Sequence, residues 1–326
     1  MTTLSTPLVR QHPHLRPFNA RKDLLSVANL IEICFASTLD ADGRRYVRQL
    51  KHMARNTAAL QMAIGSHNRS PVPAAGFVWE ERGEIVGNIS LIPFTWHSKR
   101  FYLIANVAVN PAYRRRGIGR QLTQAGVEYA LSHSNAAPWL QVRADNPTAI
   151  RLYQSLGFVE KYRRNTWLST HQQSEATLLA GMRVTTRQRG DWALQKRWFD
   201  SLYPDDILWQ FDFTAQAQAP GISGWWHRLL KGIFLRQWSI RFRGQLTGVL
   251  SWQSQGGAHT RLWLSIHPTY EQLTLPAMLW YARQRLKRYH LTFNYPAGRQ
   301  EALILNQGFV LQHTLVWMRW QNIAKA

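Results

Sequence analysis

The sequence contains a single cysteine, Cys34, among its 326 residues. One thiol excludes an intramolecular disulfide and a cysteine-based metal site. The sequence has no run of about 18 apolar residues, so we expect no membrane-spanning helix. Residues 1–14 are polar and lack the apolar core of a signal peptide. These absences favour a cytoplasmic protein without a metal, and 45% hydrophobic residues suffice to build packed cores.

Acidic residues are scarce, because 18 Asp and Glu oppose 40 Lys and Arg and leave a net charge of +22. Residues 1–170 carry 22 basic and 10 acidic residues, and residues 171–326 carry 18 and 8. The charge is therefore spread over both halves and does not form a basic tail. Such a field attracts RNA, DNA, anionic lipid or a phosphate-rich ligand. A generally basic surface that only aids solubility accounts for the same numbers.

Four segments recur in the same order in the two halves of the chain, which indicates a duplicated domain. The pairs are Gly83–Gly87 with Gly244–Gly248, Val107–Tyr113 with Leu264–Tyr270, Ser155–Val159 with Asn306–Val310, and Trp167 with Trp317. We therefore predict two domains, residues 1–170 and 171–326, joined by a linker at residues 169–180 that begins with polar residues.

Hydrophobic periodicity in the first half predicts a mixed α/β sheet. The expected order is β, α, α, three β, then α, β, α, β. Strands are expected near residues 14–18, 75–80, 85–94, 101–109 and 139–142 and at the end, up to residue 168, and helices within residues 21–55, 119–132 and 148–156.

The most informative segment runs from Arg114 to Arg120 and reads Arg-Arg-Arg-Gly-Ile-Gly-Arg. It lies between an apolar strand that ends at Val109 and an amphipathic helix. Glycines allow a tight turn, and a helix N-terminus presents unpaired N–H groups with a positive dipole. Together they predict a phosphate-binding loop. A tight strand-to-helix turn without a ligand is the simpler alternative.

This arrangement resembles the GNAT superfamily of N-acetyltransferases, whose motif is Arg/Gln-x-x-Gly-x-Gly/Ala. Arg114, Gly117 and Gly119 match it. Residues 146–158 resemble the family's second run, Asn-x-x-Ala-x-x-Leu-Tyr-x-x-x-Gly-Phe. The resemblance implies a tandem pair of acyl-CoA N-acyltransferase domains that transfers an acetyl group from acetyl-CoA to an amine. The first half is most similar to the alanine N-acetyltransferases of ribosomal proteins.

The resemblance also implies a role for each matched residue. The backbone of Val107, Ala108 and Val109 would pair with the pantetheine arm of the coenzyme. Tyr153 would act as the general acid that protonates the leaving thiolate, and Asn146 would hydrogen-bond the coenzyme. As alternatives, Tyr153 packs on the sheet and Asn146 caps the helix that begins at Pro147. Together with Arg114, the pyrophosphate site would include the backbone N–H groups of Arg115, Arg116, Gly117, Ile118, Gly119 and Arg120.

The second half lacks this loop. Aligning Tyr270 with Tyr113 places Glu271 over Arg114, and Thr274 and Pro276 over the two glycines. Proline removes a backbone donor, and glutamate places an acid where a phosphate would lie. We therefore expect a degenerate second domain without a coenzyme site.

The acceptor and the general base are not defined by the sequence. Gln141 stands where the similar alanine N-acetyltransferases have Glu, and Gln cannot act as a base. Asn106 is the side chain on its strand that could orient an amine, while Glu80, His97 and His267 are candidate bases by residue type. The acceptor could be a small molecule, a protein N-terminus or a lysine. The rival hypothesis is a non-catalytic protein that binds RNA or the ribosome through its basic surface.

Two further segments combine basic and apolar residues. Residues 225–235 are aromatic, basic and amphipathic, so they could touch a membrane surface or stack on RNA bases. We expect instead that this helix packs on the sheet or caps the acceptor cleft. The basic residues Arg283, Arg285, Lys287 and Arg288 are expected on a solvated helix face, with RNA contact as the alternative.

Overall fold

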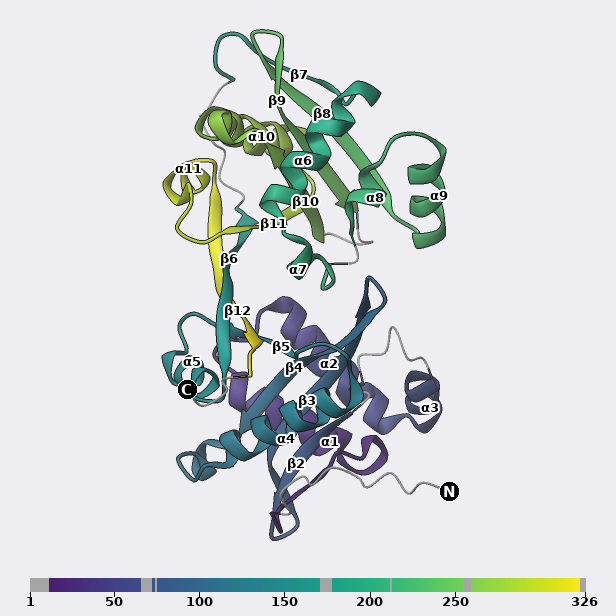
Figure 1. The fold of residues 1–326 in the computed structure, drawn as a ribbon, viewed down its shortest axis with the longest axis vertical. Helices are drawn as coiled ribbons and strands as arrows, with labels where there is room; N and C mark the ends of the chain where they lie inside the picture. The colour runs from purple at the N-terminus through teal and green to yellow at the C-terminus, as the bar shows by residue number, and fades with distance from the viewer. Residues whose placement is uncertain are drawn as a thin grey trace. The chain divides into compact units, whose positions relative to one another are not determined.

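The computed structural model describes residues 12–65, 72–73, 75–170, 178–211, 213–254 and 259–322. These residues form two compact units, each a sheet with helices on its faces (Figure 1). The first unit comprises residues 12–142, 146–161 and 317–322 of the described chain, and the second comprises residues 143–145 and 162–316. The expected linker lies partly outside the described residues, which omit 171–177.

The compact units differ from the expected division at residue 170. The chain enters the second unit at Tyr162, inside strand β6 (Phe158–Ser169), and returns to the first at Trp317, inside strand β12 (Phe309–Trp320). Each strand has 12 residues, long enough for its two ends to belong to different units. The end of β12 contacts the first unit, where the Trp320 N–H donates to the carbonyl of Pro138 at 3.0 Å.

The first unit follows the element order expected from hydrophobic periodicity, with one additional helix, α3. Its strands are ordered β1-β2-β3-β4-β5 in the sheet. The elements are β1 (Leu15–Pro17), α1 (Ala20–Phe35), α2 (Ala41–Arg55), α3 (Thr57–Gly65), β2 (Ala75–Glu81), β3 (Glu84–Trp96), β4 (Lys99–Val109), α4 (Ile118–His133), β5 (Trp139–Arg143) and α5 (Pro147–Gln154).

Helices cover both faces of this sheet. Val78 of β2 belongs to a buried cluster with Leu24 and Val27 of α1 and Leu50 of α2. The adjacent residue, Phe77, packs its ring against Tyr129 of α4 at 6.0 Å. Because successive strand residues point to opposite faces, α1 and α2 lie on one face and α4 lies on the other.

The second unit repeats this order, which confirms the predicted duplication and the mixed α/β fold class. Its sheet order is β6-β11-β10-β9-β8-β7. The elements are β7 (Met182–Thr186), α6 (Trp192–Leu202), α7 (Asp205–Leu208), α8 (Ala215–Gln218), α9 (Gly221–Lys231), β8 (Phe234–Phe242), β9 (Gln245–Ser254), β10 (His259–Ile266), α10 (Glu271–Arg285), β11 (His290–Pro296) and α11 (Glu301–Asn306).

The same two-residue turn closes the equivalent hairpin in each unit. Arg82 and Gly83 have φ angles of 51° and 81°, and Arg243 and Gly244 have φ angles of 49° and 84°. Two consecutive residues with positive φ define the type I′ turn, whose twist matches that of paired strands. Gly83 and Gly244 are the first residues of the repeated segments Gly83–Gly87 and Gly244–Gly248, so the repeat begins at the turn in both units.

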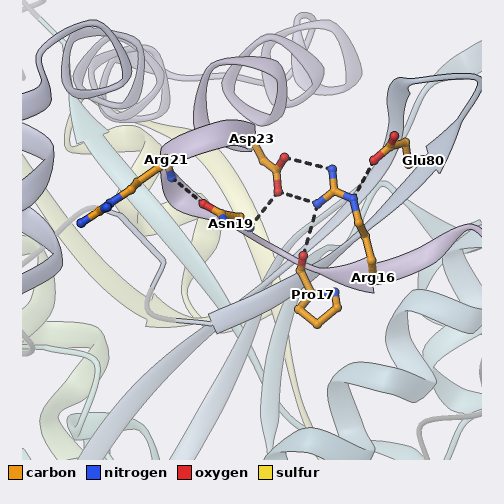
Figure 2. Close-up of polar contacts among 6 residues, drawn as sticks. All are labelled: Arg16, Pro17, Asn19, Arg21, Asp23 and Glu80. Atoms are coloured by element: carbon orange, nitrogen blue, oxygen red, sulfur yellow. Dashed lines mark hydrogen bonds and ion pairs between the residues drawn. The ribbon is translucent and has the colours of Figure 1, made fainter.

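A partly buried ion-pair network fixes the start of α1 against β2 (Figure 2). The Arg16 guanidinium donates to both carboxylate oxygens of Asp23, at 2.7 and 3.0 Å, and its Nε donates to Glu80 at 2.6 Å. The Asn19 N–H also donates to Asp23, at 2.7 Å. Burial alone would raise the pKa of the Asp23 carboxyl, but the donors from Arg16 and Asn19 outweigh it and hold that pKa below its usual range.

We predict that Asp23→Asn lowers the free energy of unfolding at pH 7 by about 1–3 kcal/mol, since Asp23 is buried while Arg16 is partly screened by solvent. A depressed carboxyl pKa contributes stability that is complete above the unfolded pKa and is lost as pH falls through the folded pKa. The difference between the two proteins should therefore begin to shrink as pH falls to about 4, near the unfolded pKa, and vanish below the folded pKa. Urea denaturation at a series of pH values measures it.

Glu32→Gln is the matched control, because Glu32 pairs with Lys51 while more than half exposed. It should change stability by less than about 0.5 kcal/mol. An equal effect of the two substitutions would show that the Asp23 network is not a special constraint.

Candidate functional site

Strands β4 and β5 separate at the centre of the first unit. Their parallel ladder consists of Leu103 with Trp139 and Ile104 with Leu140. Beyond this point β4 remains paired with β3 on its other side, up to Val109 opposite Gly87. The edge of β4 at Val107, Ala108 and Val109 is therefore free of a β5 partner, so it can take an extended ligand as an added strand.

The loop after β4 leaves a series of backbone N–H groups unused. Backbone bonding stops at Arg114, whose N–H meets the Pro111 carbonyl at 3.4 Å, and resumes at Arg120, whose N–H meets the Gly117 carbonyl at 3.0 Å. The intervening N–H groups, from Arg115 to Gly119, have no acceptor within the described residues. They lie at the N-terminus of α4, which is the backbone arrangement that the predicted anion site requires.

Two left-handed residues shape this loop. Arg115 has φ of 67° and Gly117 has φ of 79°. Gly117 is the N-cap of α4 and supplies no side-chain cap. A Cβ at Gly117 would meet open space, so glycine is needed here for its φ angle rather than for room. A Cβ at Gly119 would meet Leu152 and Val109 at ordinary distances of 3.5 and 3.8 Å.

Three of the four loop arginines are engaged within the first unit. The Arg114 Nε donates to the Val109 carbonyl at 3.1 Å, and Arg120 donates to the Ser155 hydroxyl at 2.7 Å. Arg116 lies over the Tyr113 ring, 4.9 Å from its centroid. The Arg115 guanidinium is exposed and has no partner among the residues that the structure describes. Arg115 is thus the side chain best placed to meet a phosphate.

Asn146 and Tyr153 stand at the two ends of α5. Asn146 caps the helix, since its Oδ1 accepts from the Ala149 N–H at 3.1 Å and Pro147 follows it. The alternative reading of Asn146 as a cap is therefore confirmed, and its side-chain NH₂ is not used by that bond. Tyr153 is buried against Phe158, with ring centroids 6.0 Å apart. Burial raises the pKa of its hydroxyl, which keeps the group protonated and able to donate a proton.

Polar residues that the sequence reasoning did not single out, Tyr46, Asn88 and Ser90, gather around Asn106 of β4. The β3–β4 register shifts between Asn88 and Ser90, and Asn106 opposite has φ of 51°. The Asn106 Nδ2 donates to the Tyr46 hydroxyl at 3.1 Å and to the Ser90 hydroxyl at 3.3 Å. Asn88 donates to the Asn106 carbonyl at 3.0 Å. The signal in the sequence was two polar residues, Asn88 and Ser90, inside an otherwise apolar strand.

The structure argues against the three candidate bases. His97 occupies the hairpin turn after β3, at the opposite end of β4 from Val109. The Glu80 carboxylate is held by Arg16 at 2.6 Å. His267 belongs to the second unit, where its Nδ1 accepts from the Thr269 N–H at 3.2 Å as a cap. Gln141 lies on β5 and is half-buried.

In the second unit, a helix and a buried carboxylate occupy the position that corresponds to the glycine loop. Helix α10 begins at Glu271, directly after a short 3₁₀ turn, so no loop corresponds to Arg114–Gly117. Glu271 is buried and accepts from the Tyr295 hydroxyl at 2.7 Å and from the Arg299 guanidinium. Pro276 lies inside the helix. The protein's own acid therefore occupies this helix start, where the first unit has unpaired donors.

The comparisons with known proteins agree with this geometry. Residues 41–158 match the model of the Acetyltransferase (GNAT) family. An alanine N-acetyltransferase of ribosomal protein bS18 from Escherichia coli K12 is 42% identical over 76 residues, which cover 23% of this chain and 51% of that protein. The N-alpha-acetyltransferase RimI of Mycobacterium tuberculosis is 40% identical over 57 residues, covering 18% and 34%. The chain thus spans at most about half the length of these curated relatives.

A solved GCN5-related N-acetyltransferase from Sphaerobacter thermophilus aligns with a TM-score of 0.57 and 14% identity, covering 94% of each chain. Both units therefore have the fold of this class. Residues 41–158 of the first unit are similar in sequence to the acetyltransferase (GNAT) family, and the second unit is a further copy of the same fold. Within the described residues, no helix is long and apolar enough to cross a membrane, and no group of three metal-ligating side chains is found.

We predict that Gly117→Ala and Gly119→Ala have different effects on coenzyme A binding. Alanine at 117 either keeps φ near 79°, at a cost of about 1–2 kcal/mol, or relaxes to a negative φ and reorients the loop N–H groups. It should weaken coenzyme A binding about tenfold, a loss that corresponds to roughly 1.4 kcal/mol. Gly119→Ala should bind within about twofold of the parent, because its Cβ fits the contacts that are already present. Calorimetric titration with coenzyme A measures both, and equal losses would contradict the assigned roles.

Proposed function

We propose that the protein is an N-acetyltransferase that transfers the acetyl group of acetyl-CoA to an amine, with one coenzyme site in the first unit. The observation that supports it most is the set of unused N–H groups at Arg115–Gly119 beside the free edge of β4. The N–H groups bind the pyrophosphate of the coenzyme, and the free edge of β4 pairs with its pantetheine arm. Two relatives are named as an alanine N-acetyltransferase of ribosomal protein bS18 and as an N-alpha-acetyltransferase, which supports acetyl transfer to an amine.

The proposed reaction is direct attack of a neutral amine on the thioester carbonyl. A C–N bond forms, the C–S bond breaks, and the thiolate leaves with the electron pair. Tyr153, whose buried hydroxyl is protonated before the reaction, donates its proton to that thiolate. The amine releases a proton to solvent, and the tyrosine takes up a proton from solvent in its place. Asn146 orients the coenzyme through the amide NH₂ that its helix cap leaves unused.

We place the acceptor amine near Asn106. Both donor contacts of its amide point to Tyr46 and Ser90, which directs Oδ1 away from them and toward an incoming N–H. The Glu expected by similarity is replaced by Gln141, which cannot take a proton. The acceptor therefore enters as a free amine, and a protein N-terminus fits this better than a lysine because the α-amino pKa of about 8 lies well below that of lysine.

The second unit serves as a non-catalytic partner domain in this proposal, since Glu271 and the continuous start of α10 occupy its coenzyme position. A protein with these properties and a reduced thiol acts in the cytoplasm. The rival function, RNA or ribosome binding without catalysis, is favoured by the charge of +22 and by Gln141. It predicts RNA affinity that falls steeply with salt.

Titration of the purified chain with acetyl-CoA tests the proposal directly. We expect one-to-one binding with a Kd of order micromolar, about −8 kcal/mol. The variant Gly117→Glu with Gly119→Glu should abolish it, because two carboxylates then face the pyrophosphate. Gly190→Glu is the charge control, since a Cβ at Gly190 meets open space in the other unit. Absence of binding by the parent would reject the enzyme and leave RNA binding as the better reading.

Tyr153→Phe tests the general acid. We expect kcat to fall by about 100-fold with the KM for acetyl-CoA changed by less than about twofold, since the hydroxyl acts on the departing thiolate and not on binding. Thiol release from acetyl-CoA, with a peptide that begins with alanine as acceptor, provides the assay. Tyr129→Phe on α4 is the control and should retain parental kcat. An unchanged kcat in Tyr153→Phe would leave this residue a packing role only.

A further inference from the structure

Helix α9 of the second unit presents an apolar stripe to solvent. Its members are spaced by three and four residues along the helix and are between 51% and 80% exposed: Ile222, Trp225, Trp226, Leu229 and Leu230. This spacing places all five on one helix face. We expected this helix to pack on the sheet or to cap the acceptor cleft, and the exposure of its apolar face contradicts packing on the sheet. Figure 1 shows α9 standing beside α8 at the margin of its own unit.

The opposite face of α9 anchors it in this orientation. A Cβ at Gly224, which is buried, would overlap the Ala219 carbonyl, so only glycine permits this close approach. The Arg228 guanidinium donates to the carbonyls of Ala217 and Ala219, at 2.9 and 3.1 Å. Four residues apart, Gly224 and Arg228 share one face. The helix is therefore held by its small and polar side while its apolar side faces outward.

The segment of the chain that carries the stripe is basic and contains no acidic residue. Between Asp212 and Glu271 the sequence has six Lys and Arg and no Asp or Glu. Phe234, half exposed just after the helix, extends the apolar surface, and the Arg236 guanidinium lies 5.4 Å from its ring centroid. Tryptophan beside aliphatic residues and flanked by cations is the composition of a helix that lies in a membrane interface.

We infer that the α9 stripe docks on an anionic phospholipid surface, with the helix axis in the membrane plane. Charge complementarity favours this occupant over a second copy of the chain, because both copies carry +22. The aliphatic side chains Ile222, Leu229 and Leu230 favour lipid over RNA, because bases stack on aromatic faces. Such docking places the acetyltransferase at a membrane surface and does not depend on which amine it acetylates.

Flotation of the full-length chain with lipid vesicles tests this inference. The vesicles contain phosphatidylcholine with or without about 30% phosphatidylglycerol, whose negative surface potential attracts basic segments. We expect the chain to float with the anionic vesicles. The bound fraction should be at least about tenfold lower with phosphatidylcholine alone, and about 0.5 M salt should release the chain. Tryptophan emission should shift to the blue as Trp225 and Trp226 leave water.

The variant Trp225→Gln, Leu229→Gln, Leu230→Gln should lower the partition coefficient at least about tenfold, because it removes three of the apolar side chains that enter the lipid. Met62→Gln with Leu305→Gln is the matched control, since both residues are exposed apolar side chains elsewhere. It should bind vesicles like the parent. Acetyl-CoA titration of each variant verifies the fold and keeps this test separate from that of the enzyme.

Three outcomes would overturn the inference. The parent chain could fail to float with anionic vesicles, or the triple variant could float as well as the parent. In the third outcome, neither protein binds vesicles, the parent sediments as a dimer, and the triple variant sediments as a monomer. That result would assign the stripe to a second copy.

Discussion

The separation of β4 from β5 is the constraint on which the site depends. A parallel ladder that stops after two residue pairs leaves backbone donors and acceptors at the centre of a sheet, where they would normally be paired. The chain on either side is arranged to use this opening. On one side, β4 ends in the glycine loop and the start of α4. On the other, β5 leads to α5, which carries Asn146 and Tyr153. The bulge at Asn106 places polar groups where the acceptor would enter.

The two units differ in how the backbone and side-chain groups at this position are satisfied. In the first, a left-handed glycine and five N–H groups remain without an acceptor among the described residues. In the second, the same stretch is a continuous helix whose first residue, Glu271, is bonded by Tyr295 and Arg299. A backbone N–H group that has no protein acceptor is available to a ligand or to water. The second copy has internal partners at this position instead.

Local sequence signals were sufficient for the parts of the fold that local chemistry determines. Gly83 and Gly244 set the hairpin turns, Gly117 sets the loop, and Asn146 before Pro147 starts a helix. Each acts through its own backbone or its immediate neighbours. The duplication was also readable, because four segments kept their order.

Features that depend on a choice between partners could not be read in this way. Periodicity indicates that residues 158–169 form a strand but not that its second half pairs with β11. The spacing of apolar residues in α9 defines one helix face, yet the same spacing describes a buried face and an exposed one. What decided between them was Gly224 and Arg228 on the other side. The cluster around Asn106 depends on a register shift, which no single strand reveals.

The exchange of residues within β6 and β12 has a consequence for how the chain could evolve. Each strand begins in one unit and ends in the other, so neither unit consists of one uninterrupted half of the sequence. After duplication, substitutions could alter the segment before α10 without affecting the strands, because that segment is local. Deletion of the whole second copy would also remove residues 317–320 of β12, which belong to the first unit. The two copies are therefore joined by strands that each contribute residues to both units.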